Sequence, residues 1–515
     1  VIGEDITNYD IGGAKILGAW TGIVDIVACD KLHLARCIGM VQRLFCSPSR
    51  LSAIARKGNG APLYDTASGS IVFKESDIRA NVDDGVFWPF KENYYAAEAL
   101  IGGFARLGGR RVLIMGPRTH SGLRSLASII KARELLKTAY RTGSHQILIL
   151  GRRWHQTPDI HENIQMRPRM DFMNTLQKKS GLKIHIITHP EGLKCFDINS
   201  AADAIICIRD PSSPPSDAVF TEKNAAFLAD SLAGAFDLAH RLISVIDPLC
   251  VPAPFTAPAT APSIPEDPSQ PYDIIGSVIG HVFDPGTFIE FYRDMNNPVT
   301  GPNLITGLAG LEGRTVGIIA DQPLIKGGGA DAIGTEKFRV FTEFLNYHRL
   351  PLIMLSNSSG FVPGSQQERH RIQAIGAESL DVNILGTMPV VSAVLNQNYG
   401  GRLIHAFNKF LRPGIVYLAL EQAIMAVIGV EAAFDLLFGK KYNRLMDKGE
   451  TERAEDLRKS FLETYLDRAR ASEDGVESNL VDWTIPSVKD LRSHLVRGLE
   501  LAIQRCAEAF GKKEG

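Results

Sequence analysis

The chain has 515 residues, of which 45% are hydrophobic and 22% charged, and its formal net charge is -1. These values are ordinary for a globular protein, and a chain of this length has room for two to four domains. The near-zero net charge excludes a global basic field of the kind that binds nucleic acid. No uninterrupted apolar run reaches the roughly 18 residues that a membrane-spanning helix needs.

Seven cysteines are scattered along the chain, and no two of them form a C-x-x-C pair. This pattern argues against a zinc ribbon and favours inert thiols in a reducing compartment. We therefore expect a cytoplasmic protein, or one of the mitochondrial matrix if the source is eukaryotic. The sequence begins with Val1 and shows no signal peptide, which we interpret as processing or a missing upstream segment.

Two stretches of the chain have the composition of linkers. Cys46 to Tyr64 is rich in Ser, Gly and Pro, and Asp247 to Tyr272 is so rich in Pro that no regular element is expected there. The predicted segments are therefore 1–48, 49–248, a Pro-rich linker at 249–273, and 274–515.

An internal repeat follows the linkers. The stretches Glu98 to Gly116 and Pro302 to Ala320 align without a gap, and each reads as a hairpin of two strands with a Gly turn. A helix from Ser128 or Thr335 follows, and then a short apolar strand from Ile147 or Leu352. The same order of elements after both hairpins predicts a duplicated α/β unit with mixed sheets flanked by helices.

The strand "LPLIMLSNSS" in the second copy leads into a glycine turn. Gly360 allows a sharp reversal through Phe361 and Val362, and Ser365 with Glu368 is expected to form a capping box for the next helix. Backbone N–H groups at such a turn suit an oxyanion. Taken alone, the turn is more typical of an ordinary connection between a strand and a helix.

A second glycine turn occurs one unit later. We expect an apolar strand from Val390 to Leu395, a break at Asn396 to Tyr399, and a helix from Leu403 to Phe410. Gly400 and Gly401 lie between them and would let the backbone approach a ligand closely. Together the two turns predict one site lined by main-chain amides, including those of Gly401 and Arg402.

Little else in the sequence indicates catalysis. The motifs H-E-x-x-H and G-x-S-x-G and the Walker loop are absent, and no metal-ligand spacing is present. We expect His348, His370 and His405 to have structural or solvent-facing roles, and the Gly-rich segment from Ile325 to Gly334 is a candidate loop near a ligand. An enzyme without a side-chain base needs a base from a cofactor or a substrate.

The segment from about Tyr272 to Val496 resembles the C-terminal domain of carboxyltransferase (beta) subunits of biotin-dependent acyl-CoA carboxylases, and of the related glutaconyl-CoA decarboxylase alpha type. The similarity is carried by "YDIIGSVI...FDPGTFIEF", "GPNLITGLAGLEGRTVGIIADQP", "LPLIMLSNSSGFVPGSQQE", "NQNYGGRLIHA" and "EQAIMAVIGVEAAFDLLFG". The resemblance implies a crotonase-like superhelix of ββα units. It also implies that carboxybiotin supplies both CO2 and the base, while the protein stabilises two oxyanions with backbone amides.

By correspondence with that family, Gly401 and Arg402 have the catalytic role, as donors to the biotin oxygen. The expected cofactor-binding residues are Gly360, Phe361, Val362, Tyr399 and Gly400. The family usually has a small residue where this chain has Arg402, and this long cation is expected either to block biotin or to attract a carboxylate.

The remaining parts of the chain resemble the family less closely. The first 46 residues are similar to the end of the family's N-terminal domain, and the rest of that domain, which largely holds coenzyme A, is not in this sequence. Residues 65–248 resemble a degenerate copy of the C-terminal domain. Its counterparts of the two turns are Gly151 to Asp159 and His189 to Lys194, where Pro190 and Glu191 disfavour an anion. We interpret this copy as a structural platform or a subunit contact.

The resemblance thus implies a carboxyltransferase component that acts on a coenzyme A thioester. Two alternatives stay open: an acyl-CoA decarboxylase alpha subunit that runs the same chemistry in reverse, and a non-catalytic scaffold of a carboxylase complex. No A-M-K-M biotinylation motif is present, so biotin carboxylase and the biotin carrier are expected on separate chains. An oligomer with composite active sites is also expected, without a nucleic-acid partner or a membrane span.

Overall fold

The computed structural model divides the chain into two compact units, Val1–Asp247 and Pro248–Gly515, which are described separately below. The structure describes residues 13–21, 23–46, 73–92, 94, 99–118, 126–151, 162–178, 181–189, 196–208, 227–246, 255–267, 270–292, 301–405, 409–470 and 480–511. The expected linker from Cys46 to Tyr64 and most of the two degenerate turns lie outside these residues.

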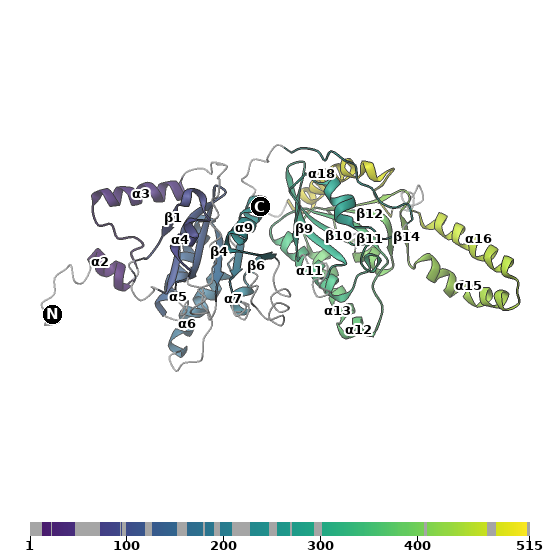
Figure 1. Cartoon of the computed structure of the whole chain (residues 1–515), viewed down its shortest axis with the longest axis horizontal. Helices are drawn as coiled ribbons and strands as arrows, with labels where there is room; N and C mark the ends of the chain where they lie inside the picture. The colour runs from purple at the N-terminus through teal and green to yellow at the C-terminus, as the bar shows by residue number, and fades with distance from the viewer. Residues whose placement is uncertain are drawn as a thin grey trace. The chain divides into compact units, whose positions relative to one another are not determined.

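The first unit contains a seven-stranded sheet in the order β1-β2-β3-β4-β5-β6-β7 (Figure 1). Its strands are β1 (Phe87–Pro89), β2 (Leu100–Leu107), β3 (Arg110–Pro117), β4 (His145–Leu150), β5 (Lys183–Ile187), β6 (Ala204–Ile208) and β7 (Phe227–Ala229). Its α-helices are α2 (Ala14–Ile16), α3 (Lys31–Phe45), α4 (Glu75–Arg79), α5 (Leu126–Thr142), α6 (Glu162–Leu176), α7 (Phe196–Asn199) and α9 (Leu232–Ile246), with short segments η1 (Leu17–Thr21) and η2 (Asp83–Gly85).

The second unit contains a sheet of eight strands, seven of which follow in the order β15-β13-β12-β11-β10-β9-β8. Its strands are β8 (Ile289–Phe291), β9 (Leu304–Leu311), β10 (Arg314–Asp321), β11 (Leu352–Ser358), β12 (Val390–Tyr399), β13 (Ile415–Leu420), β14 (Ile424–Ala426) and β15 (Trp483–Ile485). Its α-helices are α10 (Gly280–Val282), α11 (Ala332–Tyr347), α12 (Ser365–Arg369), α13 (Ile372–Leu385), α14 (Gly401–His405), α15 (Val430–Asp447), α16 (Thr451–Ala469) and α18 (Leu491–Phe510), with short segments η5 (Ile275–Ile279), η7 (Lys326–Gly328) and η8 (Val488–Asp490).

The two sheets are built in the same way, as the internal repeat predicts. The first three strands pair antiparallel in each unit (β1-β2-β3 and β8-β9-β10). The strands that follow on the main path, β4 to β7 and β11 to β13 with β15, pair in parallel. The off-path strand β14 is also parallel to β12. The predicted hairpins are therefore present, and the α/β class with two mixed sheets is confirmed.

Each hairpin turn is fixed by an equivalent carboxylate. Asp83 accepts hydrogen bonds from the amides of Gly108 and Gly109, at 3.0 and 2.6 Å. Asp284 accepts from the amides of Glu312 and Gly313, at 3.2 and 2.8 Å. Charge-assisted bonds of this kind are stronger than neutral ones, so each carboxylate stabilises the turn between its first two long strands.

A buried lysine also repeats in the two units. Lys131 of α5 donates to the carbonyl of Leu100 at 2.9 Å, and Lys337 of α11 donates to the carbonyl of Leu304 at 2.6 Å. Leu100 and Leu304 are aligned positions of the internal repeat. Burial lowers the pKa of both ammonium groups to about 8. The units thus share a buried polar contact as well as a strand order.

Helices cover both faces of the second sheet. Val316 and Ile318 of β10 point into an apolar cluster that includes Leu495 and Leu499 of α18. Gly317, between them, faces the other side, where a Cβ would lie 2.3 Å from Leu345 of α11. This alternation is the period of two expected for a strand that is buried on both faces.

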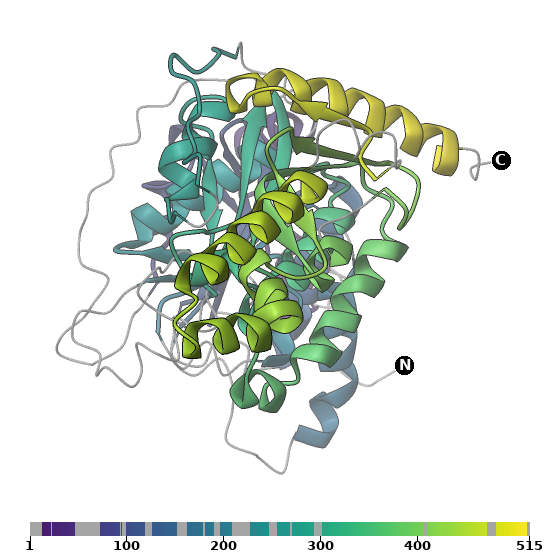
Figure 2. The same cartoon turned by 90° about the vertical axis from the view of Figure 1, so that its right-hand side faces the viewer.

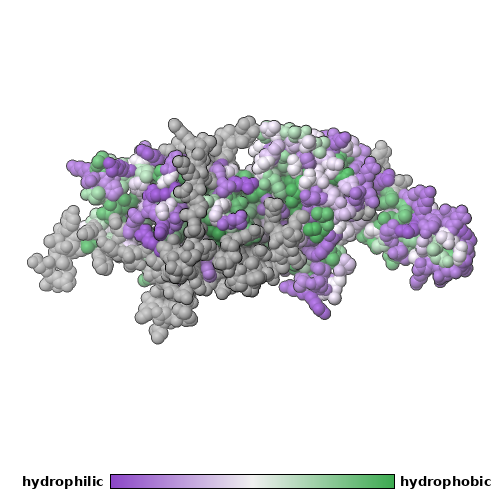
Figure 3. All heavy atoms as spheres, viewed as in Figure 1, coloured by the Kyte–Doolittle hydropathy of each residue, from purple (hydrophilic) through white to green (hydrophobic). Residues whose placement is uncertain are grey.

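The hairpin of α15 and α16 extends away from the sheet of its own unit (Figure 1), and in Figure 2 it is the yellow-green pair of helices in front of that sheet. It has an aromatic cluster of its own, in which the Phe461 ring lies 5.6 Å from the Phe434 ring and 5.4 Å from the Phe438 ring. The face of this hairpin seen in Figure 3 is mainly hydrophilic. Among the described residues, no helix combines the length and the hydrophobicity that crossing a bilayer requires.

Two boundaries differ from the sequence prediction. Strand β12 continues through the polar residues as far as Tyr399 instead of ending at Leu395. Asn398 remains in the strand because its amide group donates to Ser356 Oγ on the neighbouring strand, at 2.9 Å. The following helix, α14, begins at Gly401 rather than Leu403, and its described part extends as far as His405.

The predicted capping box before α12 is wrong. Ser365 is the first helical residue, and the N-cap is Gly364, which has no side chain to cap with. Gly364 has φ of 132°, a conformation that favours glycine. The helix therefore starts one residue earlier than predicted, with Gly364 instead of Ser365 at the N-cap.

Candidate functional site

Three parallel neighbours of the second sheet, β10, β11 and β12, end at the same edge. The Gly-rich loop follows β10, the Gly360 turn follows β11, and the Gly400-Gly401 turn follows β12. In sheets of this kind, the carboxyl ends of parallel strands are where ligands usually bind. The fold therefore brings together the two turns and the loop that the sequence singles out.

The two turns are in direct contact. A Cβ placed on Gly401 would lie 3.3 Å from Cε2 of Phe361, and one on Gly360 would lie 3.4 Å from the carbonyl oxygen of Tyr399. The predicted site residues are thus adjacent parts of one region of the fold, partly buried and partly exposed: Gly360, Phe361, Val362, Tyr399, Gly400, Gly401 and Arg402. Larger side chains at Gly360 or Gly401 would push the turns apart.

The amides of the first turn are mostly used within the fold. The Gly360 amide donates to Ser358 Oγ at 3.2 Å, and the Val362 amide donates to the carbonyl of Ala330 at 2.9 Å. These two amides are not available to a ligand in this conformation. In this conformation the Val362 amide therefore does not line an anion site, contrary to expectation. The Phe361 amide is not used in the β-bridge between Phe361 and Ala330.

The amides of the second turn are arranged differently. Gly400 has φ of 60°, and its amide donates to the carbonyl of Ala426 at 3.0 Å. The Leu403 amide donates back to the carbonyl of Gly400 at 3.1 Å. The amides of Gly401 and Arg402 lie between them, at the start of α14, where an α-helix offers no acceptor of its own. Among the described residues, no partner is recorded for either N–H group.

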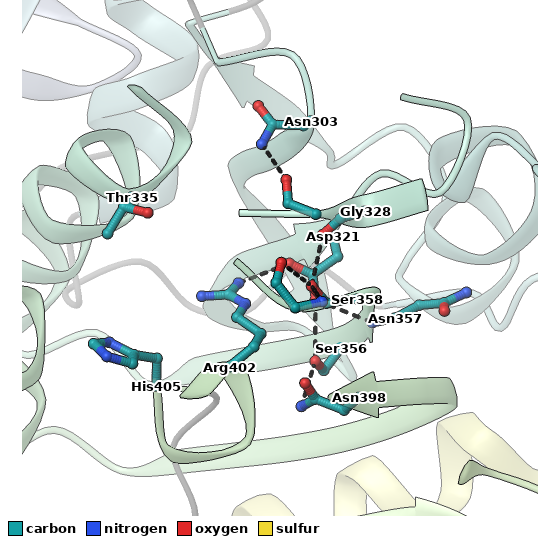
Figure 4. Close-up of polar contacts among 12 residues, drawn as sticks. Asn303, Asp321, Gly328, Thr335, Ser356, Asn357, Ser358, Asn398, Arg402 and His405 are labelled. Atoms are coloured by element: carbon teal, nitrogen blue, oxygen red, sulfur yellow. Dashed lines mark hydrogen bonds and ion pairs between the residues drawn. The ribbon is translucent and has the colours of Figure 1, made fainter. Parts of the chain in front are cut away.

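The Gly-rich loop is held against the first turn. Ser358 Oγ donates to the carbonyl of Gly328 at 2.8 Å, and Asn303 Nδ2 donates to that of Gly329 at 2.6 Å. Gly328 has φ of 70°, and a Cβ there would lie 2.0 Å from the carbonyl oxygen of Asn357. The loop therefore lies against the end of β11, where Figure 4 shows Gly328 near Ser358.

The Arg402 side chain points into the domain rather than toward solvent. The residue as a whole is 1% exposed, and Nη2 of its side chain lies 2.7 Å from Oδ1 of Asp321 at the end of β10. Its guanidinium carbon lies 5.2 Å from the centre of the Phe338 ring. The carboxylate that this cation attracts in the structure is the internal one of Asp321, which neutralises it.

Sequence reasoning missed the polar network around Asp321 (Figure 4). Asp321 Oδ2 accepts from Ser356 Oγ and from the Asn357 amide, both at 3.0 Å. Ser356 Oγ in turn accepts from Asn398 at 2.9 Å. The available signal was the row of polar residues at the ends of otherwise apolar strands, since buried polar groups need partners.

His405 lies beside Phe361, with the ring centroids 5.1 Å apart. Its Nδ1 is 3.1 Å from Ser379 Oγ. Burial and, to a smaller extent, the nearby Arg402 charge together lower the pKa of His405 to about 4. The imidazole is therefore neutral at pH 7, which agrees with a structural role and provides no cation at the site.

The site as a whole suits an oxygen acceptor. It presents two adjacent main-chain N–H groups beside a residue without a Cβ, and the neighbouring cation is paired. Because α14 is short, its helix dipole adds little to the attraction for a negative oxygen. The hydrogen bonds from the N–H groups themselves would provide the stabilisation. This arrangement is what stabilises negative oxygen in a transition state without a reactive side chain.

Comparison with known families identifies the class of protein. The profile described as carboxyl transferase domain matches residues 234–515, which is more than half of the sequence. The chain therefore belongs to the carboxyl transferase family.

Individual relatives support this assignment. The propionyl-CoA carboxylase beta chain of Saccharopolyspora erythraea is 30% identical over 252 residues, which is 49% of this chain and 44% of that protein. The methylmalonyl-CoA carboxyltransferase 12S subunit of Propionibacterium freudenreichii is 32% identical over 215 residues, which is 41% of this chain and 40% of that protein. The matches thus span less than half the length of these relatives.

Solved structures share the fold. The crystal structure of transcarboxylase 12S has a TM-score of 0.70 and 21% identity, and the likeness covers 95% of this chain and 99% of that one. A single-chain, multi-domain long-chain acyl-CoA carboxylase has a TM-score of 0.64 and 17% identity, with 91% and 50% covered. These likenesses confirm the crotonase-type fold of the sequence prediction.

Proposed function

We propose that this chain is the carboxyltransferase component of a biotin-dependent acyl-CoA carboxylase. The observation that carries the proposal is the pair of N–H groups of Gly401 and Arg402, which start α14 without an internal acceptor. They lie in the part of the chain that matches the carboxyl transferase family. Two of the relatives are named for propionyl-CoA and methylmalonyl-CoA, as a propionyl-CoA carboxylase beta chain and a methylmalonyl-CoA carboxyltransferase 12S subunit.

The residues of this chain would hold oxygen and exclude water. The amides of Gly401 and Arg402 would donate to the ureido oxygen of biotin, on which negative charge develops when CO2 leaves. When bound, carboxybiotin supplies the CO2 and, after its release, a basic ureido nitrogen. Phe361 packs beside Gly401 and would cover the oxygen from one side, and a hydrogen bond gains strength where water is excluded.

The coenzyme A thioester is the second ligand of the proposed reaction. The crystal structure of transcarboxylase 12S, a hexamer, contains methylmalonyl-coenzyme A. We extend this ligand class to the present chain, and we propose an oligomer with composite active sites, to which more than one subunit contributes. Biotin carboxylase and a biotin carrier are proposed as the partners that supply carboxybiotin.

A direct assay tests this function. The purified protein is mixed with free carboxybiotin and, in turn, acetyl-, propionyl- and a long-chain acyl-CoA, and carboxylated thioester is measured by mass spectrometry. The reverse half-reaction, decarboxylation of methylmalonyl-CoA that depends on free biotin, is measured in parallel. Product in either direction supports the proposal.

The contrary result is also defined. If no thioester is carboxylated or decarboxylated, with or without the biotinylated protein that co-purifies with the chain, the carboxyltransferase proposal is wrong. A stable complex with the biotinylated protein in that case would indicate a scaffold.

A further inference from the structure

The buried carboxylate of Asp321 contacts both segments that form the proposed site, namely the end of β11 and the start of α14. Asp321 is the last residue of β10, and Arg402 is the second residue of α14. Both side chains are 2% exposed, and Nη2 of Arg402 lies 2.7 Å from Oδ1 of Asp321. The ion pair therefore connects the interior of the sheet to the residue whose amide is a proposed donor.

The second oxygen of the same carboxylate holds the neighbouring strand. Asp321 Oδ2 accepts from Ser356 Oγ and from the main-chain amide of Asn357, both at 3.0 Å. Asn357 is three residues before Gly360 on the chain that forms the first turn. Asp321 thus fixes the stem of the first turn with one oxygen and the start of α14 with the other (Figure 4).

Stability alone does not explain why a charged pair lies here. Removing two charges from water is costly, and buried ion pairs can often be replaced by apolar groups of similar volume without loss of stability. What an ion pair provides instead is direction, because the guanidinium must lie where its N–H groups point at the carboxylate. The Phe338 ring beneath the guanidinium restricts it further.

We infer that Asp321 and Arg402 are positioning residues, which set the Gly401 and Arg402 amides relative to Phe361. The expected effect of the ion pair on kcat rests on the proposed function, whereas its expected effect on the position of the two turns does not. Neither side chain touches the proposed ligand. Their role is to keep the two N–H groups aimed at one point.

The test removes both charges at once, so that no unpaired charge is left buried. The variant is Asp321→Asn combined with Arg402→Met. The matched control is Asp284→Asn combined with Arg492→Met, because that ion pair, at 2.7 Å, is also largely buried in the second unit. It joins α18 to the β9-β10 turn and contains no residue of the proposed site.

Three quantities are measured on the full chain. Urea unfolding checks that the variants fold, hydrogen exchange with mass spectrometry follows peptides covering 359–364 and 398–405, and steady-state kinetics give kcat and KM. We expect exchange in these two peptides to become at least about tenfold faster and kcat to fall at least about tenfold, with KM for the thioester nearly unchanged. In the control variant, exchange in both peptides and kcat should stay as in the wild type.

A conservative variant separates positioning from packing. Arg402→Lys keeps a cation that can reach Asp321 with a single contact, so it should retain more of kcat and of the slow exchange than Arg402→Met alone. If the uncharged double variant shows wild-type exchange and wild-type kcat, the inference is wrong. If the wild type itself has no transferase activity, the proposed function fails, and the exchange result alone then decides whether the ion pair positions the turns.

Discussion

At the scale of single residues, the site depends on positions where a side chain is missing or turned inward. Gly401 lets Phe361 approach, and Gly328 lets the loop after β10 touch the end of β11. The main-chain N–H of Arg402 is one of the two proposed donors, while its guanidinium is buried beside Asp321. The cation is therefore neutralised inside the fold at the same position that supplies a proposed donor.

Two adjacent glycines of the loop provide a test of this close approach. Gly327 and Gly328 both have positive φ, 59° and 70°, but a Cβ on Gly327 meets nothing nearer than 3.7 Å, whereas one on Gly328 meets the Asn357 carbonyl at 2.0 Å. We predict that Gly327→Ala lowers the free energy of unfolding by about 1 kcal/mol, from backbone strain alone. Gly328→Ala should cost roughly 2–3 kcal/mol more, because the chain must also shift.

Urea unfolding of the two variants measures this difference. Equal costs for the two substitutions would show that the loop does not press against the Asn357 carbonyl as the structure places it.

At the scale of elements, the hairpin at the start of each sheet is the unit that repeats. In both copies a buried aspartate accepts two amide hydrogen bonds from the turn. The second copy adds an ion pair, since Arg492 of α18 lies 2.7 Å from Asp284. The helix that covers the sheet is thereby attached to the same turn.

Substitution of the two aspartates should reveal this difference between the copies. We predict that Asp83→Ala lowers the free energy of unfolding by roughly 2 kcal/mol, because two amides lose a charged acceptor. Asp284→Ala should cost more, roughly 3–5 kcal/mol, because it also leaves Arg492 without its partner. Exposed Asp456 on α16 is the control, and its change to Ala should alter stability by less than about 0.5 kcal/mol. An Asp284→Ala cost no larger than that of Asp83→Ala would contradict this account.

At the scale of the whole molecule, each unit has its own sheet and its own core, and among the described residues each has a buried or half-buried histidine whose pKa is lowered. Burial lowers the pKa of His185 in the first unit to about 4, and it does the same for His405 in the second. In the unfolded chain, both histidines have a pKa near 6.5. Between these values the unfolded chain binds more protons than the folded one, so stability falls as the pH falls from about 6.5 to 4.

This linkage predicts acid sensitivity that can be assigned to each unit. His185→Gln and His405→Gln should each reduce the loss of unfolding free energy between pH 7 and pH 5, by on the order of 1–2 kcal/mol over that interval. The exposed His370→Gln variant should leave the pH dependence as it is in the wild type. Urea unfolding at several pH values measures the effect, and an unchanged pH profile for both buried-site variants would show that carboxylates alone govern acid unfolding.

Much of the fold could be predicted because the relevant signals are local. Alternating apolar residues around Gly109 and Gly313 indicate hairpins, and the gapless repeat predicts that the two units share an order of strands. The juxtaposition of the two turns also follows, since they come after adjacent parallel strands. These inferences need only the periodicity of side chains and the chemistry of glycine.

The errors arose where tertiary contacts override the local pattern. Asn396 and Asn398 look like the end of a strand, but β12 continues because its polar side chains find partners, such as Ser356 for Asn398. Asp321 and Arg402 are 81 residues apart in sequence, and nothing in either neighbourhood indicates that the two side chains meet. The internal hydrogen bonds of the Gly360 and Val362 amides likewise depend on residues outside the turn.

The central claim is that the main-chain N–H of Gly401, with that of Arg402, stabilises an oxyanion, and one pair of variants tests it most directly. Gly401 is the first residue of α14, where proline fits a helix, so Gly401→Pro removes the N–H with little cost to the helix. Gly401→Ala adds a Cβ against Phe361 but keeps the N–H.

The measurement is kcat for carboxyl transfer from free carboxybiotin by the two variants. We predict that Gly401→Pro loses about 100- to 1000-fold in kcat and Gly401→Ala much less. Equal kcat values for Gly401→Pro and Gly401→Ala would show that this N–H has no part in the reaction.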